Sequence, residues 1–268
     1  MASPRSGAKS DSEESTLRLA VLIDADNAQA AVIEALLAEI ARFGEATVKR
    51  IYGDFTAPTS ASWKKVLQRY AIKPVQQFAY STGKNATDST LIIDAMDLLY
   101  TRKFDGFCLI TSDSDFTGLA MRLREEGITV FGFGERKTPE AFRNACHKFV
   151  FTEVLRQSRV VEPAGQPSKE GAEQKAAVSR TAPETTEHTH VFPKEFVLTA
   201  LEQSTDDAGW AQLGTFGSYL TKLQPDFDSR LYGYRKLSDL VKARTDLFIT
   251  EERQASGSSQ KVLYLRAK

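Results

Sequence analysis

The stretch LITSDSDFTGL, residues 109–119, changes character twice within a few positions. It begins inside an apolar run, GFCLITS (106–112), passes two carboxylates, Asp113 and Asp115, and continues into FTGLAMRLREEG (116–127), where apolar residues recur at helical spacing. A short apolar run is typical of a buried strand, and the segment after it is typical of a helix that ends at a glycine. The stretch therefore predicts a junction between strand and helix that carries two acids.

The same alternation of strand-like and helix-like segments extends on both sides of this junction. The further expected strands are residues 17–23, 47–55, 74–80 and 128–134. The further expected helices are residues 28–44, 61–72, 87–104 and 138–155, the last with a short extended tail. Repeated alternation of this kind is typical of a parallel sheet with helices on both faces. We therefore expect an α/β domain over residues 17–155.

The composition changes after this domain and again near residue 192. Residues 156–191 hold few large apolar side chains, so we expect a flexible linker there, and a disordered tail over the polar residues 1–16. The last part of the chain contains three helical segments and then two strands, at residues 195–204, 213–224, 235–244, 247–253 and 261–267. This is the order of a winged helix-turn-helix, so residues 192–268 predict a small α+β domain.

The totals for the whole chain limit the classes of function. Of 268 residues, 35 are Lys or Arg and 35 are Asp or Glu, so the zero net charge argues against capture of nucleic acid by overall charge but allows a local basic groove. The two cysteines, Cys108 and Cys146, lie in apolar segments and are expected to be core thiols, as in a reducing cytoplasm. We find neither a signal peptide nor a stretch of membrane-spanning length. These features predict a soluble cytoplasmic protein with no membrane partner.

Acidic residues follow two of the expected strands. Asp24 and Asp26, with Asn27 beside them, follow LRLAVLI, and Asp113 and Asp115 follow GFCLITS. Sites in open parallel sheets form beyond the carboxyl ends of the strands. We therefore expect both acidic pairs at the same edge of the sheet.

A third acid comes from the helix expected at residues 87–104. Asp88 shares a helical stripe with Ile92 and Ala95, so it occupies the first turn of the core-facing side, whereas Asp94 lies toward the flank. Carboxylates brought close together raise each other's pKa unless a cation neutralises them, and oxygen-only ligands favour Mg²⁺ or Mn²⁺ over zinc. Such a cation can promote hydrolysis of a phosphodiester.

Each acid also has a simpler interpretation. Asp26 and Asp115 fit helix caps or turns, and Asp88 fits an acid that faces a helix dipole. We expect Asp54 and Asp97 to be ordinary surface acids. Convergence of the acidic segments on one edge of the sheet favours the metal site over these separate explanations.

Four motifs in the first domain resemble those of NYN domains, a branch of the PIN-like nuclease superfamily. The motifs are VLIDADN, GKNATDSTLIIDAMDLL, LITSDSDFTGL and ITVFGFGERKTPEAFRNACHKFVF, and the resemblance covers residues 17–155. It implies a Rossmann-like, PIN-type fold and metal-dependent ribonuclease activity. The family's functional positions fall on Asp24, Asn27, Asp88, Asp94, Asp113 and Asp115.

The resemblance suggests a role for each of these residues. Asp24, Asp88, Asp113 and Asp115 are the expected ligands of Mg²⁺ or Mn²⁺, with Asp94 as a further candidate at the edge of the site. Asn27 is expected to position water or the RNA backbone. Lys84, four residues before Asp88, is a candidate contact to the scissile phosphate, although a lysine in a polar loop is commonly just solvated.

The second domain is similar to the OST-HTH or LOTUS module, an RNA-binding winged helix. The similarity covers residues 192–268 and depends on FVLTALEQS, LGTFGSYLTKLQPDF and LYGYRKLSDLV. Tyr234, Arg235 and Lys236 place an aromatic ring beside two cations, the combination that holds unpaired nucleotides, so they are the expected RNA contacts. A solvated helix start explains the two cations equally well. The same domain is also a candidate surface for a second copy of the chain or for a partner protein.

The sequence therefore predicts a metal-dependent ribonuclease tethered to an RNA-binding winged helix, which raises the local concentration of RNA near the nuclease. One alternative is an RNA-binding adaptor that uses a nuclease fold without catalysis. Another is a phosphatase with an aspartyl nucleophile in IDADN. That chemistry needs Thr or Val at the fifth position of the loop, where this chain has Ala28.

Overall fold

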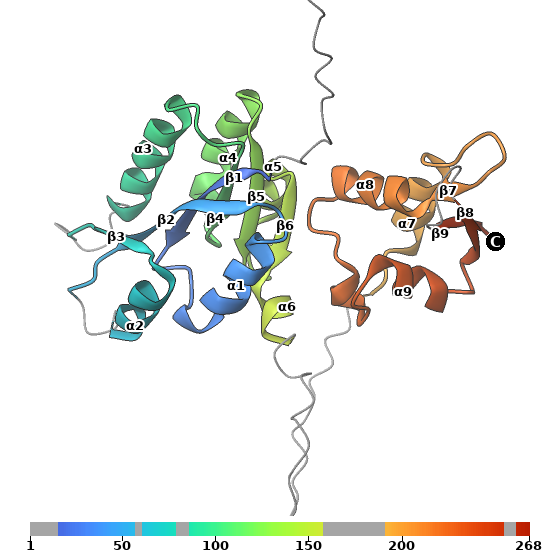
Figure 1. Ribbon diagram of the computed structural model, residues 1–268, viewed down its shortest axis with the longest axis horizontal. Helices are drawn as coiled ribbons and strands as arrows, with labels where there is room; N and C mark the ends of the chain where they lie inside the picture. The colour runs from blue at the N-terminus through green and yellow to red at the C-terminus, as the bar shows by residue number, and fades with distance from the viewer. Residues whose placement is uncertain (1–15, 57–60, 79–85, 158–190, 255–260) are drawn as a thin grey trace, which may run out of the picture. The chain divides into compact units, whose positions relative to one another are not determined.

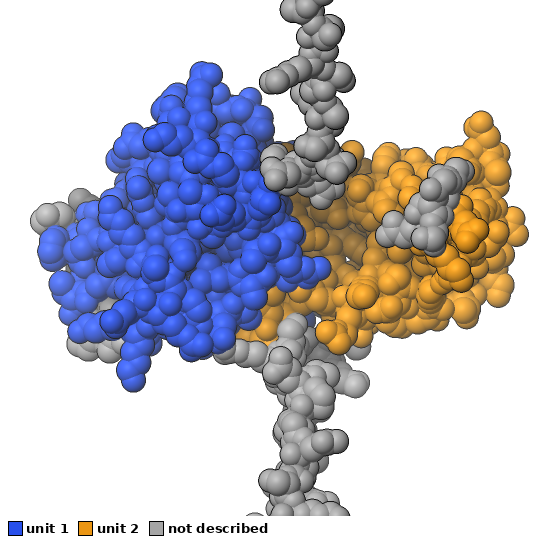
Figure 2. Space-filling view, viewed as in Figure 1, with its two compact units in different colours: residues 1–146 blue, residues 147–268 orange. Residues whose placement is uncertain are grey.

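The computed structural model describes residues 16–56, 61–78, 86–157, 191–254 and 261–268. Lys84, nearly all of the expected tail and most of the expected linker lie outside these residues. The chain divides into two compact units, residues 1–146 and 147–268 (Figure 2). The division falls one strand before the end of the sheet described next.

A six-stranded sheet forms the centre of the first domain, in the order β3-β2-β1-β4-β5-β6 (Figure 1). Its strands are β1 (Arg18–Asp24), β2 (Glu45–Gly53), β3 (Lys73–Gln76), β4 (Gly106–Ile110), β5 (Thr129–Gly134) and β6 (Lys148–Phe151). The pairings that join β1 to β5 are parallel. Every residue of β4 is buried, as is typical of a strand covered on both faces.

Helices cover both faces of this sheet. They are α1 (Ile33–Ile40), α2 (Ala61–Tyr70), α3 (Ala86–Tyr100), α4 (Thr117–Glu125), α5 (Glu140–Ala145) and α6 (Thr152–Gln157). Short 3₁₀ turns, η1 (Ala30–Val32) and η3 (Ser114–Phe116), precede α1 and α4. The strand order reverses between β1 and β4, so right-handed connections place α1 and α2 on one face and α3 and α4 on the other (Figure 1). The predicted α/β fold is confirmed.

Residues 138–155 were expected to form one helix with a short extended tail, but the helix is shorter than predicted and a full strand and a second helix, α6, follow it. Helix α5 ends at Ala145, and Cys146 adopts an extended backbone. The apolar run that follows forms β6, in which Phe149, Val150 and Phe151 are all buried. A continuous apolar run fits a buried strand as well as a helix, and here the open edge of β5 decides in favour of the strand.

Two glycines after helices have different physical roles. Gly127, just beyond α4, has φ of +77°, the left-handed conformation expected of a glycine that ends a helix. Gly44 was expected to end a helix in the same way, but α1 already ends at Ile40. A Cβ atom on Gly44 would lie 2.4 Å from the Leu17 carbonyl oxygen, so close approach of two backbones explains this glycine.

The C-terminal domain has the expected order of helices and strands. It contains α7 (Lys194–Glu202), β7 (Ala211–Gln212), α8 (Leu213–Leu223), η4 (Ser229–Tyr232), α9 (Leu237–Ala243), β8 (Phe248–Gln254) and β9 (Lys261–Ala267). The three strands form an antiparallel sheet in the order β7-β9-β8. Its core includes Phe216, Leu220, Leu240, Phe248 and Leu265. The short strand β7 is an addition to the prediction. None of the described helices in either domain is long and apolar enough to cross a membrane.

Candidate active site

The acidic residues of the first domain gather where the strand order reverses. Asp24 ends β1, and Thr111 and Ser112 directly follow its neighbour β4. Loops leave these two strands toward opposite faces of the sheet, and ligand sites of open parallel sheets form at such a point. The fold thus delivers residues 24–27 and 111–115 to one place.

Asp24 is fully buried and is held by three donors. Its Oδ1 atom accepts a hydrogen bond from the Asp26 amide at 3.0 Å. Its Oδ2 atom accepts one from Asn27 Nδ2 at 2.7 Å and one from Thr111 Oγ1 at 2.9 Å. Hydrogen bonds of this kind satisfy the oxygen atoms of a carboxyl group that is buried away from water. Asn27 and Thr111 therefore fix the orientation of Asp24.

The Thr111 hydroxyl also connects Asp24 to the loop after β4. It accepts a hydrogen bond from the Asp113 amide at 3.1 Å while it donates to Asp24. Asp113 in turn caps η3, because its Oδ1 atom accepts from the Asp115 amide at 2.9 Å. Capping in this loop was expected of Asp115, but Asp113 is the cap, and the cap uses one oxygen of the Asp113 carboxylate.

Three carboxylates from two distant segments approach one another at this site. Asp88, in the first turn of α3, and Asp113 and Asp115 each offer an oxygen atom within 4.8 Å of the others. Burial raises the pKa of Asp88 from 3.8 to about 6, and the negative charges of four neighbouring carboxylates add to the effect. The group thus combines oxygen ligands with an excess of negative charge, the property of a cation site.

Asp24 lies outside this group of three but close enough to affect it. Among the neighbouring charges that raise the pKa of Asp88, that of Asp24 is the largest. Partial burial raises the pKa of Asp26, with smaller contributions from the charges of Asp24 and Asp54. The structure therefore brings all four of the expected main ligands into one acidic region, with three in mutual reach.

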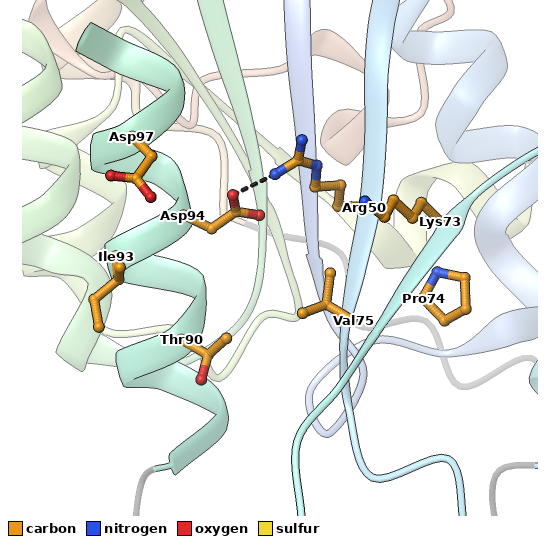
Figure 3. A pocket seen from close by; sticks show the side chains of 8 residues that line it. All are labelled: Arg50, Lys73, Pro74, Val75, Thr90, Ile93, Asp94 and Asp97. Atoms are coloured by element: carbon orange, nitrogen blue, oxygen red, sulfur yellow. Dashed lines mark hydrogen bonds and ion pairs between the residues drawn. The ribbon is translucent and has the colours of Figure 1, made fainter. Parts of the chain in front are cut away.

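Asp94 has other partners. Its two carboxylate oxygens accept hydrogen bonds from Arg50 and from the Tyr52 hydroxyl, both on β2 (Figure 3 shows the Arg50 contact). Burial, and then the bond to Asp94, raise the pKa of Tyr52. Asp94 therefore fastens α3 to β2 and is not a member of the group of three carboxylates. In the sequence, residues 50 and 52 lie on the same face of the expected strand, but nothing in the sequence shows that this face meets α3.

An open pocket of about 360 Å³ lies beside the contact of Asp94 with Arg50, which anchors α3 to β2 (Figure 3). It is lined by Arg50, Lys73, Pro74, Val75, Thr90, Ile93, Asp94 and Asp97. Asp97, the expected surface acid, is exposed at this place. None of the three clustered carboxylates lines the pocket, so it is separate from the acidic site.

The expected RNA contacts of the C-terminal domain differ in exposure. Tyr234 is partly buried and packs against the core. Arg235 and Lys236 are exposed, and Lys236 directly precedes α9. The two cations are therefore accessible to a phosphate, whereas much of the tyrosine ring is occupied by packing.

The fold agrees with comparisons to known families. A family model for the NYN domain matches residues 18–155, about half of the chain. The chain belongs to the NYN domain family. A model for the OST-HTH/LOTUS domain matches residues 192–259. The NYN domain is a PIN-like nuclease family, and the OST-HTH/LOTUS domain is an RNA-binding domain, so both recognised resemblances are confirmed.

Several solved structures are similar to parts of this NYN protein. A solution structure of a protein from Nitrosomonas europaea is 69% identical and covers 36% of this chain and 92% of its own, with a TM-score of 0.30. One from Chromobacterium violaceum is 31% identical and covers 30% of this chain and 84% of its own, with a TM-score of 0.24. A crystal structure of a protein of unknown function from Vibrio parahaemolyticus is 16% identical and covers 52% of this chain and 94% of its own, with a TM-score of 0.44. No curated protein matches the chain.

Proposed function

We propose that the NYN domain is a metal-dependent ribonuclease that hydrolyses RNA phosphodiester bonds, and that the OST-HTH/LOTUS domain holds the RNA. The observation that carries this proposal is the approach of Asp88, Asp113 and Asp115 to within 4.8 Å at the point where the strand order reverses. The pKa of Asp88 is raised by burial and then by four neighbouring negative charges, and this surplus charge supports the proposal because it favours binding of a cation.

The donor set fits Mg²⁺ or Mn²⁺. All three members of the group are carboxylates, and neither histidine nor cysteine joins them among the described residues. Hard divalent cations prefer such oxygen ligands, whereas zinc prefers nitrogen and sulfur. Asp88, Asp113 and Asp115 would hold the cation, with Asp24 beside them. When bound, the cation supplies stabilisation of the negative charge that builds on a phosphate during hydrolysis.

The chain's own residues organise the acids. Thr111 holds Asp24 and the Asp113 amide at once, which fixes the distance between the ends of β1 and β4. Asn27 keeps Asp24 oriented through its amide nitrogen, and its amide oxygen is our proposed contact to water or the RNA backbone. Preorganised groups of this kind lower the reorganisation needed during the reaction.

The exposed side chains of Arg235 and Lys236 are the proposed phosphate contacts of the OST-HTH/LOTUS domain.

We place the protein in the cytoplasm, which the state of its two cysteines supports. Cys108 and Cys146 are both free and buried, and burial raises the pKa of each thiol, to about 12 for Cys146. Inert reduced thiols suit a reducing compartment.

The test is incubation of the full chain with labelled single-stranded and hairpin RNAs in Mn²⁺ or in EDTA. The double variant Asp113→Asn/Asp115→Asn should abolish cleavage, and removal of Mn²⁺ should do the same. The matched control is Asp97→Asn, which removes an exposed acid from the same domain and should cleave like the wild type. RNA that stays intact in Mn²⁺ while it binds the chain would replace this proposal with the adaptor role.

A further inference from the structure

A tryptophan of the OST-HTH/LOTUS domain lies outside its hydrophobic core. The core contains residues from α7, α8, α9 and the sheet, with three tyrosines packed against it, but includes neither Trp210 nor Tyr264. Both rings are partly exposed. Large aromatic side chains contribute most to stability when they are buried, so two partly exposed rings that the core does not use indicate another purpose.

The backbone of Trp210 is held firmly by the preceding turn. Its amide donates to Asp206 Oδ1 at 2.9 Å, and its carbonyl oxygen accepts from the Asp206 amide at 2.8 Å. Gly209, with φ of +75°, allows the turn to close. The ring is therefore presented from a fixed position at the start of β7.

Two arginines lie close to the rings of Trp210 and Tyr264. The Arg253 guanidinium lies 4.5 Å from the centre of the Trp210 ring and 4.7 Å from that of Tyr264. The Arg266 guanidinium lies 4.9 Å from the Trp210 ring. We name Trp210, Arg253, Tyr264 and Arg266 the aromatic–arginine face.

The strand pattern places this face on the solvent side of the sheet. Leu265 is fully buried in the core, so its neighbours on β9, Tyr264 and Arg266, point to the opposite side. Ile249 pairs with Arg266 and is 37% exposed, which agrees with a surface open to solvent.

Acidic residues beside the aromatic–arginine face limit the kinds of ligand that it can bind. Glu251 contacts Arg253 at 3.2 Å, and the charge of Asp206 also acts on Arg253. These acids offset the two arginines, so the face does not attract phosphates by charge alone. Planar rings and guanidinium groups still offer stacking surfaces, and bases present their faces only when they are unpaired.

We propose that the aromatic–arginine face binds single-stranded RNA by stacking of unpaired bases on Trp210 and Tyr264, with Arg253 and Arg266 as further stacking partners. This inference rests on the proposed RNA binding of the OST-HTH/LOTUS domain and adds a surface distinct in sequence from Arg235 and Lys236. It also gives the domain a preference for single strands over duplexes.

The test uses the fluorescence of Trp210 in the full chain, in EDTA so that RNA stays intact. The chain has two tryptophans, and Trp63→Phe leaves Trp210 as the sole emitter. Titration with an unstructured oligouridine should quench its emission, whereas a hairpin duplex of equal length should bind at least about tenfold more weakly. In polarisation assays Trp210→Ala should raise the Kd for oligouridine about tenfold, the usual effect of losing one stacked base. Trp210→Phe should restore most of the affinity.

Controls separate this inference from the proposed function. Lys222→Gln removes one exposed positive charge from α8 and should leave the Kd for oligouridine within about twofold of the wild-type value. Arg266→Gln should raise this Kd by more than about twofold. If the chain binds RNA without quenching of Trp210, and only Arg235→Gln/Lys236→Gln weakens binding, the aromatic–arginine face is excluded and RNA binding by the domain stands. If the wild type binds no RNA, both proposals fail. Equal affinity for the strand and the duplex also overturns the inference.

Discussion

Asp88 occupies the first turn of α3, partly buried and in reach of two other carboxylates. Its pKa is raised from 3.8 to about 6, first by burial and then by neighbouring negative charges. Ionisation of a carboxyl group in this position is unfavourable, so its negative charge near neutral pH lowers the free energy of unfolding. Perturbed groups of this kind are typical of functional sites.

Replacing Asp88 with asparagine should stabilise the metal-free protein at neutral pH. The folded-state pKa of about 6 exceeds the ordinary value of 3.8, so the stability linked to this proton is complete below about pH 4 and is lost as the pH rises through 6. In EDTA, the melting temperature of Asp88→Asn minus that of the wild type should be near zero at pH 4 and should reach its maximum above pH 7.

Addition of Mn²⁺ at pH 7.5 should make the melting temperature of the wild type higher than that of Asp88→Asn. A cation that binds only the folded state raises the melting temperature of the wild type and has less effect on the variant, which lacks one ligand. If the difference in melting temperature between the two proteins in EDTA is the same at pH 4 and pH 7.5, ionisation of Asp88 does not destabilise the protein.

Thr111 is 1% exposed, and its hydroxyl makes two hydrogen bonds, to Asp24 and from the Asp113 amide. Thr111→Val keeps the shape of the side chain but leaves the partners of the hydroxyl unsatisfied, so we expect a loss of about 1 to 3 kcal/mol in the free energy of unfolding. Thr111→Ser retains the hydroxyl and should lose less. Urea denaturation of the two variants measures the difference, and a Thr111→Val protein as stable as the wild type would contradict this role of the hydroxyl.

At the scale of the element, α3 is anchored to β2 through Asp94, Arg50 and Tyr52. We expect Tyr52→Phe and Asp94→Asn to destabilise the protein by about 1 to 2 kcal/mol each, because each change weakens a partly buried hydrogen-bond network. A double-mutant cycle should give a coupling energy of about 1 kcal/mol between them. Asp97→Asn, on the same helix but exposed, should change stability by less than about 0.5 kcal/mol. Additive effects of Tyr52→Phe and Asp94→Asn would contradict the anchor.

The elements also show what the sequence could predict. Strands such as β1 and β4 are short apolar runs that end in acids, and their parallel order follows from alternation, so the meeting of Asp24 with Asp113 at one edge was predictable. The partners of Asp94 were not predicted, because they depend on which residues of β2 face α3 in three dimensions. Strand β6 was expected only as an extended tail of the last helix, because its apolar residues also suit a helix.

The aromatic–arginine face was missed for a related reason. Trp210 lies far from the other members in the sequence, and the four residues meet only through the registers in which β7 and β8 pair with β9. The pair of cations at Arg235 and Lys236 was found because adjacent residues form a pattern visible in the sequence. Contacts that depend on the register between strands cannot be predicted from a sequence pattern. The ends of strands and pairs of adjacent charges can be.

At the scale of the whole molecule, a nuclease family and an RNA-binding domain share one chain. If the second domain holds the substrate, removal of residues 192–268 should raise the KM for long RNA while the kcat at saturation stays within about twofold, because tethering acts through effective concentration. Steady-state cleavage by the full and shortened chains measures both constants. An unchanged KM would mean that the NYN domain alone holds the RNA.

Titration of metal-free protein with Mn²⁺ by calorimetry tests the central claim most directly. We predict binding by the full chain at pH 7.5, loss of that binding in Asp113→Asn/Asp115→Asn, and retention in Asp97→Asn and in the anchor variant Asp94→Asn. Binding that persists in the double variant, or that is absent from the wild type, would contradict a cation held between Asp88, Asp113 and Asp115.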